Sequence, residues 1–250
     1  MEASHYFLIL LFFCTATLYS SAGLGGGSTY LALLTLFGFS HTRIPLFALT
    51  CNILVVLSGI CYFYQAGHLR LKNVLPFLVS SIPLAYLGGT LSLSKKLFSL
   101  LLAFSLACAG LRLFFRDREK TIQPLSWKKA CLLGFPLGAV MGFLSGLIGI
   151  GGGIFLSPLL LLLGWANSKQ AAAAASLFIL INSFSGLLGQ LSKGSSFEQL
   201  SFLLPFLLAV FLGSQLGARL GAFQLSKFTL QRVSAVILLF SSARILAGLL

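Results

Sequence analysis

The sequence predicts an all-α membrane protein, a polytopic bundle of about eight spanning helices plus two short half-helices, built from an internal duplication. Three observations support this fold class. First, 58% of the 250 residues are hydrophobic and 8% are charged, whereas a soluble domain carries about 25% charged residues. Second, the apolar residues form runs of spanning length, and third, the two halves of the chain share an ordered set of motifs. A bilayer is therefore the expected solvent.

Eight apolar runs approach the length of a spanning helix, about 20 residues. They cover 4–22, 44–66, 73–93, 97–115, 129–148, 170–192, 199–221 and 228–249. Two further apolar runs, 28–39 and 154–165, have about 12 residues each, or roughly 18 Å as helix, half of a bilayer. Each follows a glycine run directly. No Lys or Arg precedes the run 4–22, so we predict a retained helix and not a cleaved signal peptide.

The two halves of the chain match each other in order. GLGGGS at 23–28 matches GIGGGI at 149–154, and LTLFGF at 34–39 matches LLLLGW at 160–165. Chance similarity between apolar segments would not preserve this order, so we interpret it as a duplication. The chain then divides into a first transmembrane repeat at 1–115, a basic linker at 116–128 and a second transmembrane repeat at 129–250.

Positive charge predicts the orientation of the chain. The linker has an excess of Lys and Arg, which places it in the cytoplasm by the positive-inside rule. The loops around Arg70, Lys72 and Lys193 then fall on the same side. The remaining basic loops fall on the other side, those around Arg43, Lys95, Lys96, Lys169, Arg219 and Lys227. If the two short runs re-enter the membrane, the repeats are parallel; if they cross, the repeats are inverted, and the sequence leaves both alternatives open.

The glycine runs predict broken helices. Glycine costs roughly 1 kcal/mol relative to alanine inside a helix, and non-helical backbone at membrane depth is tolerated only where it lines a cavity or is buried in protein. A short helix that starts after the break points its N–H groups toward the break and carries about half a positive charge there. Bare glycine backbone lets such N–H groups converge on an anion. Two ends of this kind, one from each half, predict one anion site near the midplane.

Polar side chains inside the spans add candidate hydrogen-bond donors. Thr50 and Ser176 fall at matched positions of the repeat, and Asn52 and Asn182 lie in matched spans. Each of these side chains has a competing structural role, a hydrogen bond to a neighbouring helix. The complete set of predicted solute-binding residues is Gly23, Gly25, Gly26, Gly27, Ser28, Thr50, Asn52, Gly149, Gly151, Gly152, Gly153, Ser176 and Asn182.

Several function classes are disfavoured by what the spans lack. The four acidic residues are Glu2, Asp117, Glu119 and Glu198, all at ends or in loops, which argues against a buried proton relay or cation site. No catalytic set, metal site or cofactor motif appears, so no enzyme is predicted. The net charge of +13 is spread singly between apolar runs, so we expect no nucleic-acid partner. The expected partners are a small anionic solute and the lipid bilayer, with the oligomeric state undetermined.

The predicted function is a secondary transporter, a permease or exporter, for a small anion bound between the two repeats. Two alternatives remain open. The glycine runs are also compatible with close helix packing, as in a membrane scaffold that does not transport. A passive anion channel would use the same broken helices. A solute-lined cavity between the halves favours transport, and a dry, tightly packed seam favours the scaffold.

At the paired glycine runs the sequence resembles the TauE/SafE family of membrane transporters, often called sulfite exporters. The resemblance rests on GLGGGS at 23–28, GIGGGIFLSP at 149–158, AAAAASLF at 171–178 and the two-half layout, and it covers nearly the whole chain. It implies a multi-pass protein of the plasma or inner membrane that moves small anions, often sulfur-containing ones such as sulfite, sulfonates or sulfoacetate. The first motif has Ala32 where the family pattern has proline, as at Pro158, which predicts two unequal half-sites.

Overall fold

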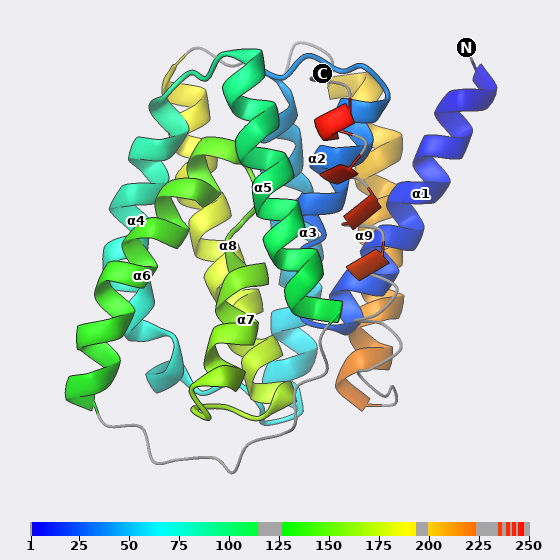
Figure 1. Cartoon of the computed structure of the whole chain (residues 1–250). Coiled ribbons are helices and arrows are strands. Elements are labelled where there is room, and N and C mark those ends of the chain that lie inside the picture. The colour runs from blue at the N-terminus through cyan, green and yellow to red at the C-terminus, as the bar shows by residue number, and fades with distance from the viewer. Residues whose placement is uncertain are drawn as a thin grey trace.

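The computed structural model describes residues 2–114, 127–193 and 200–223, together with 235–236, 239–240, 242–243 and 245–247. Every regular element within these ranges is helical, as predicted, and the helices form a bundle (Figure 1). They are α1 (Glu2–Ser21), α2 (Gly27–Leu36), α3 (Ile44–Gln65), the 3-10 turn η1 (Leu71–Asn73), α4 (Leu75–Thr90), α5 (Lys95–Phe114), α6 (Trp127–Ile148), α7 (Gly153–Leu162), α8 (Ser168–Ser192) and α9 (Leu200–Phe223). Most of the predicted linker and Lys227 lie outside the described residues.

The long helices coincide with the predicted spans. Four of them, α3, α6, α8 and the Leu203–Ala222 part of α9, are long and apolar enough to cross a membrane by length and composition. Helix α4 has 16 residues and is shorter than the predicted run 73–93, because η1 and a turn precede its start at Leu75. The last predicted span, 228–249, is described only in part. The count of eight spans therefore stays a prediction.

The two short helices, α2 and α7, lie where the sequence places them. Each has ten residues and starts directly after a glycine run. Each also ends in the same backbone motif, a left-handed glycine followed by an aromatic residue whose N–H bonds five residues back. Phe39 N donates to the Leu34 carbonyl and Trp165 N to the Leu160 carbonyl, both at 3.0 Å. The matched motifs LTLFGF and LLLLGW are thus helix stops.

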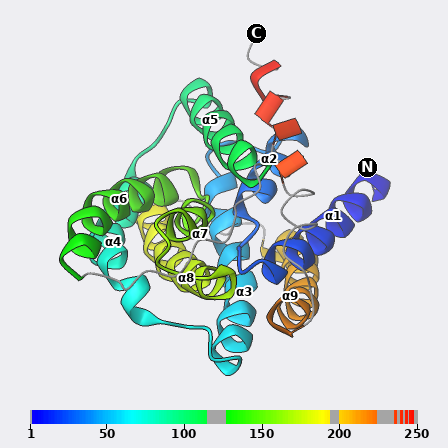
Figure 2. The same cartoon turned by 60° about the horizontal axis from the view of Figure 1, so that its bottom comes forward.

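Two helix pairs flank the centre of the bundle. Helix α4 packs along α6 and α1 packs along α9, while α3 and α8 lie between the pairs (Figure 2). Glycines spaced four apart let the backbones of each pair touch, as in other membrane helix interfaces. A Cβ built on Gly138 of α6 would collide with the Phe77 carbonyl oxygen, and one on Gly217 of α9 with the Thr17 carbonyl oxygen. The full stripes are Gly134, Gly138, Gly142 and Gly146 on α6, and Gly213, Gly217 and Gly221 on α9.

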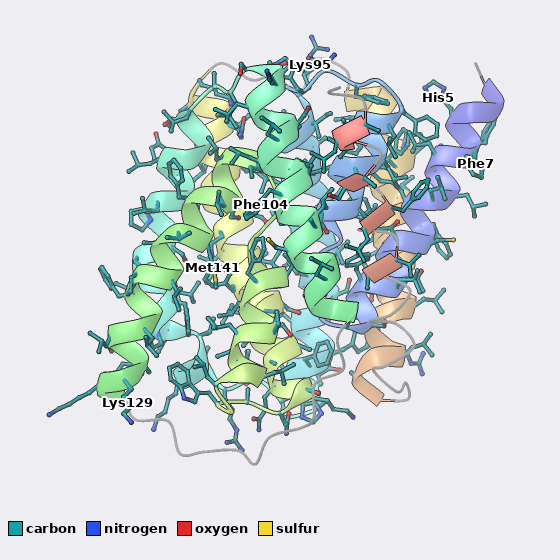
Figure 3. The ribbon with its side chains drawn as sticks, in the orientation of Figure 1. His5, Phe7, Lys95, Phe104, Lys129 and Met141 are labelled. Carbon is teal, nitrogen blue, oxygen red and sulfur yellow. The ribbon has the colours of Figure 1, made fainter. Side chains whose placement is uncertain are left out.

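The first helices of the two halves start at opposite ends of the bundle. Figure 3 labels His5 of α1 and Lys95 of α5 at one end, and Lys129 of α6 at the other. Helix α4 runs alongside α6 in the same direction, because Pro76 contacts Gly134 near both starts and Gly88 contacts Leu147 near both ends. Helices α1 and α6 therefore run in opposite directions. After each of them the chain turns back at the glycine run and enters the short helix, α2 or α7.

The predicted sides of Lys169, Lys193 and Arg219 are wrong. Lys169 Nζ donates to the Ala222 carbonyl at the end of α9, at 3.1 Å, and lies beside His68. Burial, together with the Lys169 charge, lowers the pKa of His68. Lys193 Nζ donates to the Leu91 carbonyl just after α4, at 3.1 Å, at the Lys95 end. The reason is that α7 leads the chain back to the end where α6 begins, which the sequence alone does not specify.

The corrected positions concentrate basic residues at one end. The described basic side chains at the Lys129 end are Arg70, Lys72, Lys128, Lys129, Lys169 and Arg219, and those at the Lys95 end are Arg43, Lys95, Lys96 and Lys193. The positive-inside rule therefore predicts that the Lys129 end faces the cytoplasm. This is the side predicted for the linker.

We expect single cysteines at 169 and 193 to react from opposite sides of the membrane. In vesicles of known orientation, a membrane-impermeant maleimide should label Lys169→Cys and Arg70→Cys from one side, and Lys193→Cys and Lys95→Cys from the other. Re-entrant short helices and parallel repeats would instead put 169 with 95. Labelling of 169 and 95 from a common side would therefore contradict the observed direction of α7.

Candidate functional site

Both glycine runs adopt backbone conformations that favour glycine. In the first run Gly23 and Gly26 have φ of 69° and 78°, and in the second Gly149, Gly151 and Gly152 have φ of 91°, 86° and 73°. Residues other than glycine rarely adopt a positive φ, and β-branched residues almost never do. Gly26 and Gly152 are the N-caps of α2 and α7. The left-handed turn at each cap is what redirects the chain into the short helix.

The two runs meet at Asn52 of α3. A Cβ built on Gly27 would lie 2.8 Å both from Asn52 Oδ1 and from the Ile150 carbonyl oxygen of the other run. One on Gly25 would lie 2.5 Å from Asn52 Oδ1, and one on Gly151 would lie 2.8 Å from Asn52 Nδ2. Asn52 is fully buried. The amide of Asn52 therefore lies between the starts of the two short helices, and we call this place the glycine junction.

Hydrogen bonding leaves Asn52 poorly satisfied. Its Nδ2 donates to the Ile150 carbonyl at 3.3 Å, which is long for an N–H···O bond. Its Oδ1 is buried without a partner among the described residues. An unpaired buried polar atom is costly and calls for a missing partner such as water or a ligand.

Backbone N–H groups at the junction are also unpaired. After the first run, the first N–H groups with a backbone acceptor among the described residues are those of Thr29 and Tyr30. Both donate to the Gly26 carbonyl at 3.0 Å. No described acceptor pairs with the N–H groups of Gly25, Gly26, Gly27 or Ser28, nor with those of Ile150, Gly151, Gly152 and Ile154. Helix starts of this kind bind anions through N–H groups and the helix dipole.

Ile179 of α8 is a junction residue that the sequence reasoning missed. A Cβ on Gly25 would lie 3.1 Å from Ile179 Cγ2, one on Gly151 would lie 3.0 Å from it, and one on Gly153 would collide with the same side chain. α3 thus contributes a polar side chain and α8 an apolar one. No sequence signal marks an isoleucine in an apolar helix as a site residue. The two half-sites are unequal at this contact.

The other predicted side chains have separate positions. Ser176 Oγ donates to the Gly23 carbonyl at 2.9 Å and to the Ala172 carbonyl at 3.1 Å, so it holds the first run against α8. Thr50 Oγ1 donates to the Leu46 carbonyl of its own helix at 2.9 Å. Asn182 Nδ2 donates to the Phe178 carbonyl at 2.8 Å, while its Oδ1 is buried and unpaired among the described residues. Ser28 is buried in the first turn of α2.

Ser183 lies at the junction although it is absent from the predicted set. Its Oγ would lie 3.2 Å from a Cβ on Gly151, and it is buried without a partner among the described residues. Several buried serines of the described chain, among them Ser21, Ser81 and Ser176, donate to a carbonyl one turn back, as helical hydroxyls commonly do. Ser183 could have been predicted from its spacing: it follows Ser176 by seven residues, or two turns, and so lies on the same face of α8.

The junction is neutral, closely packed and rich in N–H donors. The buried polar residues of the described chain are Ser, Thr, Asn and Gln. Glycine has two roles here. It permits the left-handed turns, and its lack of a Cβ lets α3 and α8 approach the runs to contact distance, as the packing alternative predicts. In this arrangement Asn52 and Ile179 fill the space between the runs. A solute that binds there has to replace the weak contact between Asn52 and Ile150.

Comparison with known proteins identifies the family. The family model described as sulfite exporter TauE/SafE matches residues 8–245. The probable membrane transporter protein y4hK of Sinorhizobium fredii is 32% identical over 208 residues, which covers 82% of this chain and 83% of that protein. The probable membrane transporter protein YunE of Bacillus subtilis is 24% identical over 217 residues, covering 76% of this chain and 80% of that protein. The chain therefore belongs to the TauE/SafE family and is a membrane transporter.

Proposed function

We propose that this chain is a secondary transporter for a small anion of the sulfite, sulfonate or sulfoacetate class, bound at the glycine junction between its two halves. The family description, sulfite exporter, names sulfite, and sulfonates and sulfoacetate are the related anions that the sequence resemblance implies. The described spans hold buried neutral donors at the junction, which suit an oxyanion better than a cation. The anion would accept hydrogen bonds from the N–H groups of both glycine runs.

The observation that carries the proposal is the position of Asn52 between both runs. Its Nδ2 makes only the long bond to the Ile150 carbonyl among the described residues, so Asn52 can donate to an anion without breaking a strong contact. An anion next to Nδ2 would provide the second acceptor that the junction lacks. The amide would then link the solute to α3 while the backbone N–H groups link it to α2 and α7.

The opposed directions of the two halves support an inverted duplication, which would give alternating access. Helix α1 packs on α9 and α4 packs on α6, which is the reciprocal pattern expected when the first and third long helices of each repeat exchange partners. The matched helices α1 and α6 run in opposite directions (Figure 3). Transporters built this way bind solute at broken helices on the repeat interface and rock one bundle against the other.

Asn52→Asp is the variant that tests the site. The substitution keeps the shape of the side chain and places a carboxylate beside the anion, so we expect the flux of labelled sulfite into proteoliposomes to fall by at least about a hundredfold, as for a lost charge-assisted contact plus repulsion. The control is Asn167→Asp, the same change at the N-cap of α8, where aspartate caps equally well. Equal flux in the two variants would refute the assignment of Asn52.

A passive channel would share the junction but not the energetics of transport. Coupled transport accumulates the anion beyond its electrochemical gradient, whereas a channel only dissipates that gradient. Measuring the steady-state distribution of sulfite in the same vesicles, under a set membrane potential, separates the two functions. If the reconstituted protein gives no anion flux at all, the proposal is refuted and the non-transporting scaffold is the function that remains.

A further inference from the structure

Helix α8 carries a row of buried polar atoms that starts at the junction and extends beyond it. Ser183 Oγ and Gln190 Oε1 are both fully buried and have no partner among the described residues. They are seven residues apart, which is two turns, or about 10 Å along one face of the helix. An apolar environment penalises each unpaired atom, so this packed face lacks a polar partner that water or a passing solute could supply.

Helix α6 forms the opposite wall. Gln190 Nε2 donates to the Gly146 carbonyl of α6 at 3.0 Å, and a Cβ on Gly186 would lie 2.9 Å from Gly146 Cα. The preceding residue, Ser145, also has a fully buried Oγ without a partner among the described residues. We name this contact region the α6–α8 seam and define it by Ser145, Gly146, Ser183, Gly186 and Gln190.

The seam connects two positions that attract an anion, the glycine junction and the Lys193 ammonium. Its inner end is the junction, because Ser183 Oγ lies 3.2 Å from a Cβ on Gly151. Its outer end is Lys193, three residues after Gln190, whose ammonium uses one of its three donors on the Leu91 carbonyl at 3.1 Å. Lys193 lies at the Lys95 end, opposite the Lys129 end. A cation at the mouth of a polar path raises the local anion concentration.

The polar cluster on the other side of the junction is different. Ser58 Oγ of α3 lies 3.0 Å from Ser214 Oγ of α9, and Gln215 Nε2 donates to Ser58 Oγ at 2.9 Å. Ser214 Oγ donates further to the Phe211 carbonyl at 2.8 Å. Serine and glutamine thus satisfy each other between α3 and α9, whereas the same residue types between α6 and α8 do not.

We propose that the α6–α8 seam, with Lys193 at its mouth, is the route by which the anion passes between the glycine junction and the Lys95 end of the membrane. This inference rests on the proposed function. Ser183 and Gln190 would replace part of the anion's water as it moves, and the route would open when the α4–α6 pair separates from α8. The glycines at 146 and 186 would let this contact close again without side chains in the way.

Flux measurements give the first test. Gln190→Leu should lower anion flux about tenfold, because the seam loses its amide. Lys193→Gln should lower it several-fold, and Lys193→Arg should restore it, because the charge at the mouth returns. A Lys193→Arg variant as poor as Lys193→Gln would contradict an electrostatic role for this residue.

Cysteine accessibility tests the route even where a flux variant folds poorly. The five native cysteines are replaced by alanine, and Ser183→Cys, Gln190→Cys and the control Ser81→Cys are compared in vesicles. Ser81 is fully buried on α4, with its hydroxyl bonded to the Leu78 carbonyl. The anionic reagent 2-sulfonatoethyl methanethiosulfonate, added at the Lys95 end, should modify positions 183 and 190 at least about tenfold faster than position 81, and modification at 190 should block flux.

The two proposals fail in different ways. If positions 183 and 190 react no faster than 81 while the protein transports sulfite, the seam is not the route and the transport proposal stands. If they react but sulfite, sulfonates and sulfoacetate all fail to move, the seam is an anion route and the proposed substrate class is wrong. If positions 183 and 190 react no faster than position 81 and none of these anions is transported, both proposals are overturned.

Discussion

Replacing Gly152 with valine is expected to abolish anion flux while the protein remains inserted. Gly152 is the N-cap of α7 with φ of 73°, a conformation that a β-branched residue does not adopt without strain. A Cβ there would also lie 2.8 Å from Phe178 Cε1. The start of α7 has to shift, and with it the N–H groups that point at the junction. Sulfite flux in proteoliposomes is the measurement.

Gly38→Val is the matched control for this prediction. Gly38 ends α2 with φ of 79°, but a Cβ there would meet nothing within 4 Å. The control therefore carries the backbone strain without the collision and lies away from the junction. We expect it to retain flux at reduced thermal stability. Full flux in the Gly152→Val protein would show that the geometry of the second glycine run is unimportant for transport.

Gly138→Val is expected to disrupt the fold itself. A Cβ on Gly138 would collide with the Phe77 carbonyl oxygen and lie 2.8 Å from Phe77 Cα. Backbone atoms cannot rotate away as a side chain does, so α4 and α6 have to separate along their whole length. Overpacking usually costs about 1–3 kcal/mol, and we expect the cost here to exceed that range. The measurement is the yield of monodisperse protein after extraction in mild detergent, with its melting temperature.

Val140→Leu supplies the comparison on the same helix. Val140 is 59% exposed on the outside of α6, where an added methylene meets lipid. We expect this variant to extract and melt like the wild type. A Gly138→Val protein that behaves the same way would contradict the glycine-mediated contact of α4 with α6.

The sequence predicts the local features of this fold well. Glycine runs followed by apolar stretches of about 12 residues specify broken helices because backbone preference and length act over a few residues. The stops at Gly38 and Gly164 follow from the same local rules. The structure brings glycines of both runs next to Asn52, and the binding of a solute there stays a prediction.

Long-range features were predicted less well. Nothing in the apolar sequence of α4 specifies α6 as its partner, since both helices read as generic spans. The sides of Lys169 and Lys193 depend on the direction of α7, which ten apolar residues do not encode. Ile179 contacts both glycine runs only because α8 crosses them in three dimensions, and Ser176 turned out to hold the Gly23 carbonyl.

The central claim is that an anion binds the free N–H groups of the glycine runs, and selective isotope labelling tests it directly. Glycine follows isoleucine only at Gly149 and Gly151 in this sequence, so protein labelled with carbonyl-¹³C isoleucine and ¹⁵N glycine gives two filtered amide signals. Gly149 N already donates to the Ser145 carbonyl at 2.9 Å, whereas no described acceptor pairs with Gly151 N. Titration with sulfite should shift the Gly151 signal saturably and leave that of Gly149 in place. An unmoved Gly151 signal, at sulfite concentrations that support transport, would contradict the account.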